Sequence, residues 1–169
     1  QAKETLERLN SNVEIITYKT FLTSENAISI IKDYDIIIDG TDNFKARYLI
    51  NDVCVGLGKP FVYGSIQSYS GQVSVFNVNE NSCNYRDLFP NAEELSLKEN
   101  TNKGVMGVLP SITASLQVNE AIKIITSTGE PLINQLLSFN ISNNQFITLD
   151  LTPTQKAKED SLETFNKLK

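Results

Sequence analysis

Two aspartates placed to bind a ligand stand in the segment IIIDGTDNFKAR, where Asp39 and Asp42 follow an apolar run. In open α/β sheets, ligands bind beyond the carboxyl ends of the strands, and a buried strand here would deliver both carboxylates to that position. Mg²⁺ beside a nucleotide prefers one or two carboxylates together with phosphate oxygens and water. The pattern therefore indicates that Asp42 holds Mg²⁺ beside a nucleotide phosphate.

A purely structural role accounts for the same residues. Thr-Asp-Asn before a helical pattern is ordinary capping chemistry. A carboxylate at the start of a helix accepts hydrogen bonds from backbone N–H groups and stabilises the helix by about 1 kcal/mol. For Asp39 or Asp42 taken alone, both interpretations stay open.

Other kinds of chemistry are excluded by composition. The sequence has no histidine and two cysteines, Cys54 and Cys83. Ser-His-Asp and Cys-His catalysis both need an imidazole, and two cysteines cannot supply the four thiolates of a structural zinc site. Neither structural zinc nor a disulfide framework is expected. Free thiols and the lack of a leader favour a cytoplasmic location.

Charge and hydropathy exclude two classes of partner. Lys and Arg number 15 against 20 Asp and Glu, a net charge of −5 over 169 residues. Nucleic-acid binding takes most of its affinity from basic side chains, so nucleic acid is disfavoured. Apolar runs such as Ile36–Ile38 are far shorter than the roughly 18 residues that span a bilayer. No membrane association is expected.

The elements that must position the aspartates alternate between strand and helix. Strands are predicted at residues 13–18, 34–39 and 60–63, with helices at 27–31 and 42–57 between them. The apolar run within 34–39 is typical of a strand buried on both faces of a parallel sheet. This order predicts a Rossmann-like α/β fold with helices on both faces of a doubly wound sheet.

After Gly64 the alternation stops, and the sheet is predicted to gain an antiparallel extension. The predicted segments are a strand at 71–76, a polar loop at 77–103, a long helix within 104–126 and a hairpin of strands at 135–141 and 145–151. Residues 153–169 are charged, with few apolar positions, and predict a tail or linker, or a loosely held helix.

Five blocks, in order, resemble the ThiF/MoeB/HesA family, bacterial relatives of the ubiquitin-activating enzymes. The blocks are IIIDGTDNFKARYLINDVCVGLGKPFVYGS, GQVSVF, YRDLFP, GVMGVLP and SLQVNEAIKI. The resemblance runs from about residue 6 to about residue 151. A single TDN is weak evidence, whereas five ordered blocks are specific.

The resemblance implies ATP-dependent adenylation of the C-terminal glycine of a ubiquitin-like β-grasp sulfur-carrier protein, as in thiamine or molybdopterin biosynthesis. ATP and Mg²⁺ would be the cofactors, with Asp42 as the catalytic, metal-associated carboxylate and Asn43 beside it at the nucleotide. Arg47, one helical turn further on, either reaches a phosphate or forms a surface ion pair. Residues 77–103 resemble the crossover segment under which the carrier tail is threaded, and the family commonly forms homodimers.

The sequence departs from the family at its cysteines. The family usually binds zinc with two Cys-x-x-Cys pairs, but the first pair aligns with Asn84 and Asp87, and residues 141–169 contain no cysteine. Zinc is therefore not expected. Members that form a thioester or persulfide carry a cysteine where this sequence has Asn100 and Thr101. Covalent transfer through that position is not expected either.

The family's Gly-x-Gly-x-x-Gly loop, its ribose-binding acid, its phosphate-binding arginine and its catalytic lysine lie upstream of the position that matches Gln1. Residues 1–152 are therefore expected to be the C-terminal portion of an adenylating domain. This portion would lack the N-terminal βαβ nucleotide-binding unit and be inactive alone. The alternative is a non-catalytic module that keeps the carrier-binding or dimerising surface. A nicotinamide-dependent oxidoreductase shares the fold, but its fingerprint is missing here.

Overall fold

The computed structural model describes residues 1–96 and 104–169. Its sheet has five strands in the order β1-β2-β3-β4-β5. β1 runs parallel to β2, and the later neighbours are antiparallel. This confirms the partly parallel sheet with an antiparallel extension. The strands are β1 (Ile37–Ile38), β2 (Phe61–Gln67), β3 (Ser70–Phe76), β4 (Gln135–Asn140) and β5 (Gln145–Asp150).

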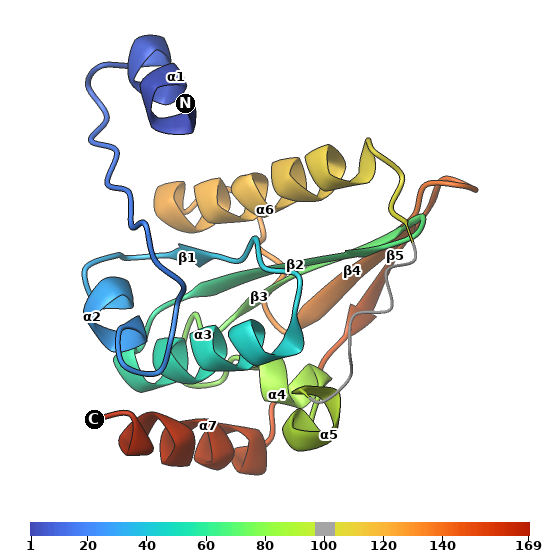
Figure 1. Ribbon diagram of the computed structural model, residues 1–169. Helices are drawn as coiled ribbons and strands as arrows, with labels where there is room; N and C mark the ends of the chain where they lie inside the picture. The colour runs from blue at the N-terminus through green and yellow to red at the C-terminus, as the bar shows by residue number, and fades with distance from the viewer. Residues whose placement is uncertain (97–103) are drawn as a thin grey trace.

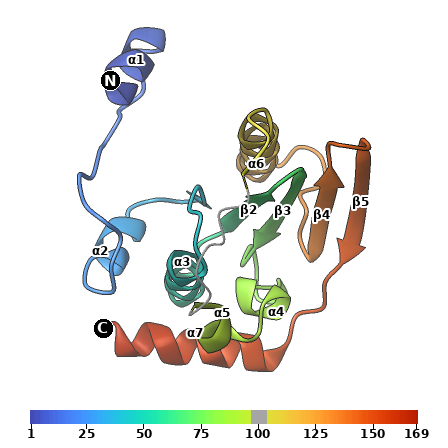
Figure 2. The same cartoon turned by 45° about the vertical axis from the view of Figure 1, so that its right-hand side comes forward.

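Helices cover both faces of this sheet (Figures 1 and 2). Helix α6 lies alone on one face, while α3, α4 and α7 lie on the other. None of the described helices is both long enough and apolar enough to cross a membrane. The helices are α1 (Ala2–Leu9), α2 (Ala27–Ile31), α3 (Phe44–Leu57), α4 (Tyr85–Leu88), α5 (Ala92–Ser96), α6 (Leu109–Thr126) and α7 (Gln155–Lys167).

Local signals fix the two ends of α3. The Asn43 side chain accepts a hydrogen bond from the Ala46 N–H at 2.8 Å, which caps the helix start. Gly58 ends the helix in the left-handed conformation, with φ 65°, which glycine adopts without steric cost. Pro60 follows two residues later and cannot continue the helix. The predicted helix is therefore confirmed: it ends at Leu57 as predicted and begins at Phe44, two residues after the predicted start.

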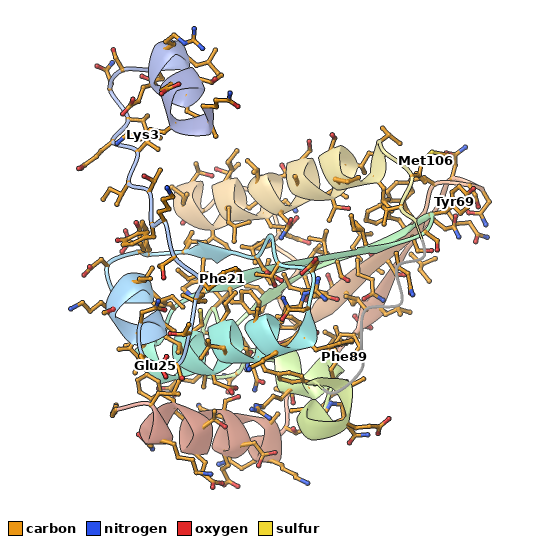
Figure 3. The ribbon with its side chains drawn as sticks, viewed as in Figure 1. Lys3, Phe21, Glu25, Tyr69, Phe89 and Met106 are labelled. Atoms are coloured by element: carbon orange, nitrogen blue, oxygen red, sulfur yellow. The ribbon has the colours of Figure 1, made fainter. Side chains whose placement is uncertain are left out.

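Aromatic rings fill the core between the sheet and α3. Tyr63 of β2, Phe76 of β3 and Tyr85 of α4 are buried, with ring centroids between 5.4 and 6.2 Å apart. Phe89, labelled in Figure 3, extends the cluster to the first residue of α3, because its ring contacts Phe44 edge-on at 5.7 Å. Such pairs stabilise by about 0.5–1.5 kcal/mol each beyond the area that they bury.

Two strand predictions need correction. Residues 13–18 form no strand and lie apart from the sheet in Figure 1; Val13, Ile16 and Tyr18 are about half exposed. A β-branched sequence forms a strand only beside a partner, and the described residues give this segment none. β1 has two residues, and Ile38 is 46% exposed, so this strand is not buried on both faces.

The predicted loop at 77–103 is more ordered than its composition indicates. Its described part contains α4 and α5. Arg86 of α4 forms a two-point ion pair with Asp52 of α3, with distances of 2.8 Å and 2.7 Å. Asn51 of α3 accepts a hydrogen bond from the Tyr85 N–H at 2.7 Å. Residues 97–103 of the predicted loop lie outside the described residues.

Residues 153–169 are not a tail or linker, because α7 packs along α3. One face of α7, spaced every four residues, is buried, and consists of Ala157, Ser161 and Phe165. The Phe165 ring lies over Gly56, where a Cβ would overlap it. A stripe with one large apolar residue gives a weak pattern in the sequence. Gly56, against which the Phe165 ring packs, lies more than 100 positions away in the chain.

Candidate functional site

A cleft of about 550 Å³ opens at the carboxyl ends of β1 and β2, between the first turn of α3 and the N-terminal half of α6. This is the position at which open α/β sheets bind ligands. The segment before α6 is held against the β2–β3 turn, since the Met106 N–H donates to the Ser68 carbonyl at 3.0 Å. Met106 and Tyr69 lie together at that end of the sheet in Figure 3. The polar residues that line the cleft include Asp39, Thr41, Asp42, Arg47, Ser65, Thr113 and Gln117.

Asp39 is buried at the floor of the cleft, 1% exposed, and organises the loop that follows it. One carboxylate oxygen accepts hydrogen bonds from the Thr41 N–H and the Thr41 hydroxyl, both at 2.7 Å. The other accepts from Arg47 Nε at 3.1 Å. Asp39 is therefore an internal brace for the loop and not a capping residue of α3.

Arg47 is buried, which corrects the surface ion pair considered for it. Its Nη2 donates to the Thr41 carbonyl at 2.7 Å, and its guanidinium lies 5.6 Å from the centre of the Tyr63 ring. Together with the Asp39 contact, Arg47 thus joins the start and the middle of the loop to α3. Arg47 also lines the cleft, where its positive charge is paired with the Asp39 carboxylate.

Asp42 is exposed at the cleft, while its neighbour takes the capping role. Asn43 is the N-cap of α3, and its Nδ2 also donates to Asp42 Oδ1 at 3.3 Å. The structure therefore brings Asp42, Asn43 and Arg47 together at one loop. Asp42 carries the carboxylate of this group, and it is an exposed residue that lines the cleft.

Gln117 is a site residue that the sequence pattern did not reveal. It lies on α6 and is 6% exposed, and its Nε2 donates to the Asp39 carbonyl at 2.7 Å and to the Val62 carbonyl at 3.3 Å. The buried face of α6 in this region is largely polar, since Thr113, Gln117 and Glu120 lie on it. The sequence pattern does not mark Gln117 as buried, and its carbonyl partners are visible only in the fold.

Asn84 and Asp87, which align with the family's first zinc-binding pair, both form hydrogen bonds within the protein. Asp87 Oδ2 accepts from the Asn84 N–H at 2.8 Å, and Asp87 Oδ1 accepts from the N–H and hydroxyl of Thr154, both at 2.7 Å. One carboxylate thus joins the start of α4 to the N-cap of α7. An amide and a committed carboxylate do not fit a site built from four thiolates.

The cysteines lie inside the core. Cys54 and Cys83 are both buried and free, and burial raises the pKa of Cys83 to about 12. Within residues 1–96 and 104–169, no three His, Cys, Asp or Glu side chains gather into a group that could hold a metal ion. Asn100 and Thr101, at the position of the family's transfer cysteine, lie outside the described residues.

The sheet order and the cleft define a Rossmann-like α/β protein with a cleft at the carboxyl ends of its parallel strands. A model of the ThiF family matches residues 1–161, and the chain belongs to that family.

Three curated relatives have closely related sequences. The chain is 42% identical to a probable molybdopterin-synthase adenylyltransferase of Pyropia yezoensis over 86% of its length, and 43% identical to the adenylyltransferase and sulfurtransferase MOCS3 of Aedes aegypti over 88%. It is 40% identical to a sulfur carrier protein adenylyltransferase of Thermus thermophilus over 86%. The chain spans 39%, 34% and 55% of the lengths of these three proteins, respectively.

Solved structures show the same fold. Escherichia coli MccB in complex with MccA-N7isoASN superposes with a TM-score of 0.75 at 15% identity, over 90% of this chain and 48% of that one. MccB with ATP superposes with a TM-score of 0.72 at 16% identity, over 90% and 47%. At this identity the likeness concerns the fold alone.

Proposed function

We propose that this chain is part of an ATP-dependent adenylyltransferase that activates the C-terminal glycine of a ubiquitin-like sulfur-carrier protein. The observation that carries the proposal is the exposed Asp42 carboxylate at a cleft on the carboxyl end of β1, beside the N-terminus of α3. The names of the relatives support the reaction and the carrier. Since the chain spans a third to about half of those relatives, the activity belongs to a longer protein.

In the proposed reaction, a carboxylate oxygen of the carrier's terminal glycine attacks the α-phosphorus of ATP. The new P–O bond gives an acyl adenylate, and the bond to pyrophosphate breaks. Asp42 would hold Mg²⁺ at the cleft, where the ion would supply positive charge beside the phosphates. The protein contributes mainly positioning and electrostatic stabilisation.

The neighbouring residues have supporting roles in this proposal. Asn43 fixes the start of α3, whose N-terminus favours anions. Arg47 lines the cleft floor on which the phosphates would lie, and its contacts with Asp39 and Thr41 hold the loop. The remaining contacts with the nucleotide are proposed to come from residues outside this chain, so the chain alone is expected to be inactive.

The carrier tail is proposed to pass under the segment 77–103. We further infer a homodimer and a cytoplasmic location, and a pathway of the molybdopterin or thiamine type, from the family resemblance. Zinc has no part in the proposal, since the residues at 84 and 87 serve as hydrogen-bond partners.

ATP–pyrophosphate exchange with the carrier tests the proposal, using the full-length protein that contains this sequence. Asp42→Ala is expected to lower the exchange rate by about 10²–10³-fold, the usual effect of losing one electrostatic contact to a transition state. Asp33→Ala is the matched control, because Asp33 is an exposed aspartate outside the cleft. Unchanged exchange in Asp42→Ala would contradict the site. No exchange in the wild-type protein would favour the non-catalytic carrier-binding or dimerising module.

A further inference from the structure

Gln117 connects α6 to the point where the parallel ladder of the sheet ends. The Asp39 N–H donates to the Val62 carbonyl at 3.0 Å, and Asp39 is the first residue after β1. The Gln117 amide donates to this same Val62 carbonyl and, at 2.7 Å, to the carbonyl of Asp39. A side chain from the helix above thus contacts both strands at the end of their ladder.

The fold leaves a space for this amide. Gly64 of β2 is buried opposite Gln117, and a Cβ at Gly64 would overlap the Gln117 amide group. The glycine has no unusual backbone angle to explain it, since Gly58 and Gly129 are the glycines of the described chain with positive φ. Close approach of the amide is therefore the physical reason for a residue without a side chain at this position.

The Asp39 peptide is the base from which the Asp42 loop starts. The Asp39 carboxylate holds Thr41, and Arg47 holds the Thr41 carbonyl. These contacts fix the loop relative to α3, whereas Gln117 fixes it relative to the sheet and α6. Without the Gln117 contact, the loop would lose its link to α6 and keep the hydrogen bond of the Asp39 N–H to the Val62 carbonyl.

We propose that Gln117 is a positioning residue, which sets the place of Asp42 in the cleft by holding the Asp39 carbonyl. This inference rests on the proposed function, since it assigns Gln117 a part in the placement of the metal-associated carboxylate. The inference predicts that replacing Gln117 lowers kcat by more than the fraction of folded protein falls.

The experiment compares the buried amide of Gln117 with the half-buried amide of Asn77, each of which donates to two backbone carbonyls. Gln117→Glu removes the donor at the cleft. Asn77→Asp removes an amide donor at the opposite end of the sheet. There, Asn77 Nδ2 donates to the carbonyls of Cys54 and Lys59, both at 2.8 Å. Asn77 has φ 57°, a conformation that aspartate also tolerates. Gln117→Met is a second variant that fills the space without a donor or a charge.

Steady-state ATP–pyrophosphate exchange gives kcat and KM for the full-length variants, and urea denaturation gives the folded fraction under assay conditions. Both Gln117 variants are expected to lose at least tenfold in kcat per folded molecule, with KM for ATP changed less than threefold. Asn77→Asp is expected to keep kcat within twofold while it loses stability. Wild-type kcat in Gln117→Met, or an equal loss in Asn77→Asp, would overturn the positioning role alone. Absence of exchange in the wild-type protein would overturn the proposed function and this inference with it.

Discussion

The buried ion pair between Asp39 and Arg47 makes the sharpest prediction about stability. The two side chains are 0% and 8% exposed, and their charged atoms lie 3.1 Å apart. Asp39→Asn keeps the shape of the side chain but leaves the guanidinium buried without its counter-charge. Breaking a buried pair in this way costs about 3–5 kcal/mol. Since 1.4 kcal/mol is tenfold, the unfolding constant should rise by about two to four powers of ten.

The double variant Asp39→Asn/Arg47→Met separates the charge effect from the loss of packing. Replacing both members of a buried pair by neutral groups of similar size is often close to neutral. The double variant is therefore expected to recover at least half of the stability that Asp39→Asn loses. The exposed pair of Lys167 with Glu163, 70% and 68% exposed, supplies the control. Glu163→Gln should leave the stability nearly unchanged, because exposed ion pairs contribute little.

Urea denaturation at pH 7, followed by circular dichroism and tyrosine fluorescence, measures these differences, because the protein has six tyrosines and no tryptophan. Added salt should leave the cost of Asp39→Asn unchanged, since buried pairs are screened far less than exposed ones. Equal stabilities of Asp39→Asn and the double variant would refute the reasoning. A cost for Asp39→Asn no larger than that for Glu163→Gln would refute it too.

Three further predictions concern other parts of the fold. Phe165→Ala should lower the free energy of unfolding by about 3–5 kcal/mol, because the buried Phe165 ring joins α7 to α3. An unchanged melting temperature of the variant would mean that α7 is a loose tail. Cys54 and Cys83 should resist iodoacetamide at pH 8 in the native protein, because burial raises the pKa of both thiols. Early labelling, detected by mass spectrometry, would show that the thiols are accessible. Asp87→Ala should lower the melting temperature and increase hydrogen exchange in α7, because Asp87 holds Thr154 at the start of that helix. A zinc chelator should leave the melting temperature unchanged. A drop on adding the chelator would contradict a link made by hydrogen bonds.

Elements with local signals could be predicted from the sequence. The α3 helix has its cap at Asn43 and its stop at Gly58 within the segment itself. The strands β4 and β5 are joined by a short polar turn and pair with each other, so their hairpin needs no distant partner. In both cases the groups that satisfy the backbone are neighbours in the chain, which is why the pattern is sufficient.

Elements that depend on distant partners could not be predicted. Residues 13–18 have the composition of a strand, but pairing requires a neighbour that the sequence pattern does not identify. Helix α7 has a weak stripe because its main contact, Phe165, fits over a glycine of α3. The candidate site shows the same limit. The segment around Asp42 could be found from residue type and order, whereas the burial of Asp39 and Arg47 became visible only in the fold.

The polar floor of the cleft follows from how β1 ends. A strand of two residues leaves the carbonyls that follow it without a regular ladder, and an unpaired buried carbonyl costs about 1–3 kcal/mol. Gln117 and Arg47 satisfy the carbonyls of Asp39 and Thr41, and the Asp39 carboxylate offsets the charge that Arg47 brings. Apolar residues in place of Gln117 and Arg47 would leave these carbonyls without their donors. The short strand therefore requires polar residues beneath it, and those same contacts hold the loop that presents Asp42.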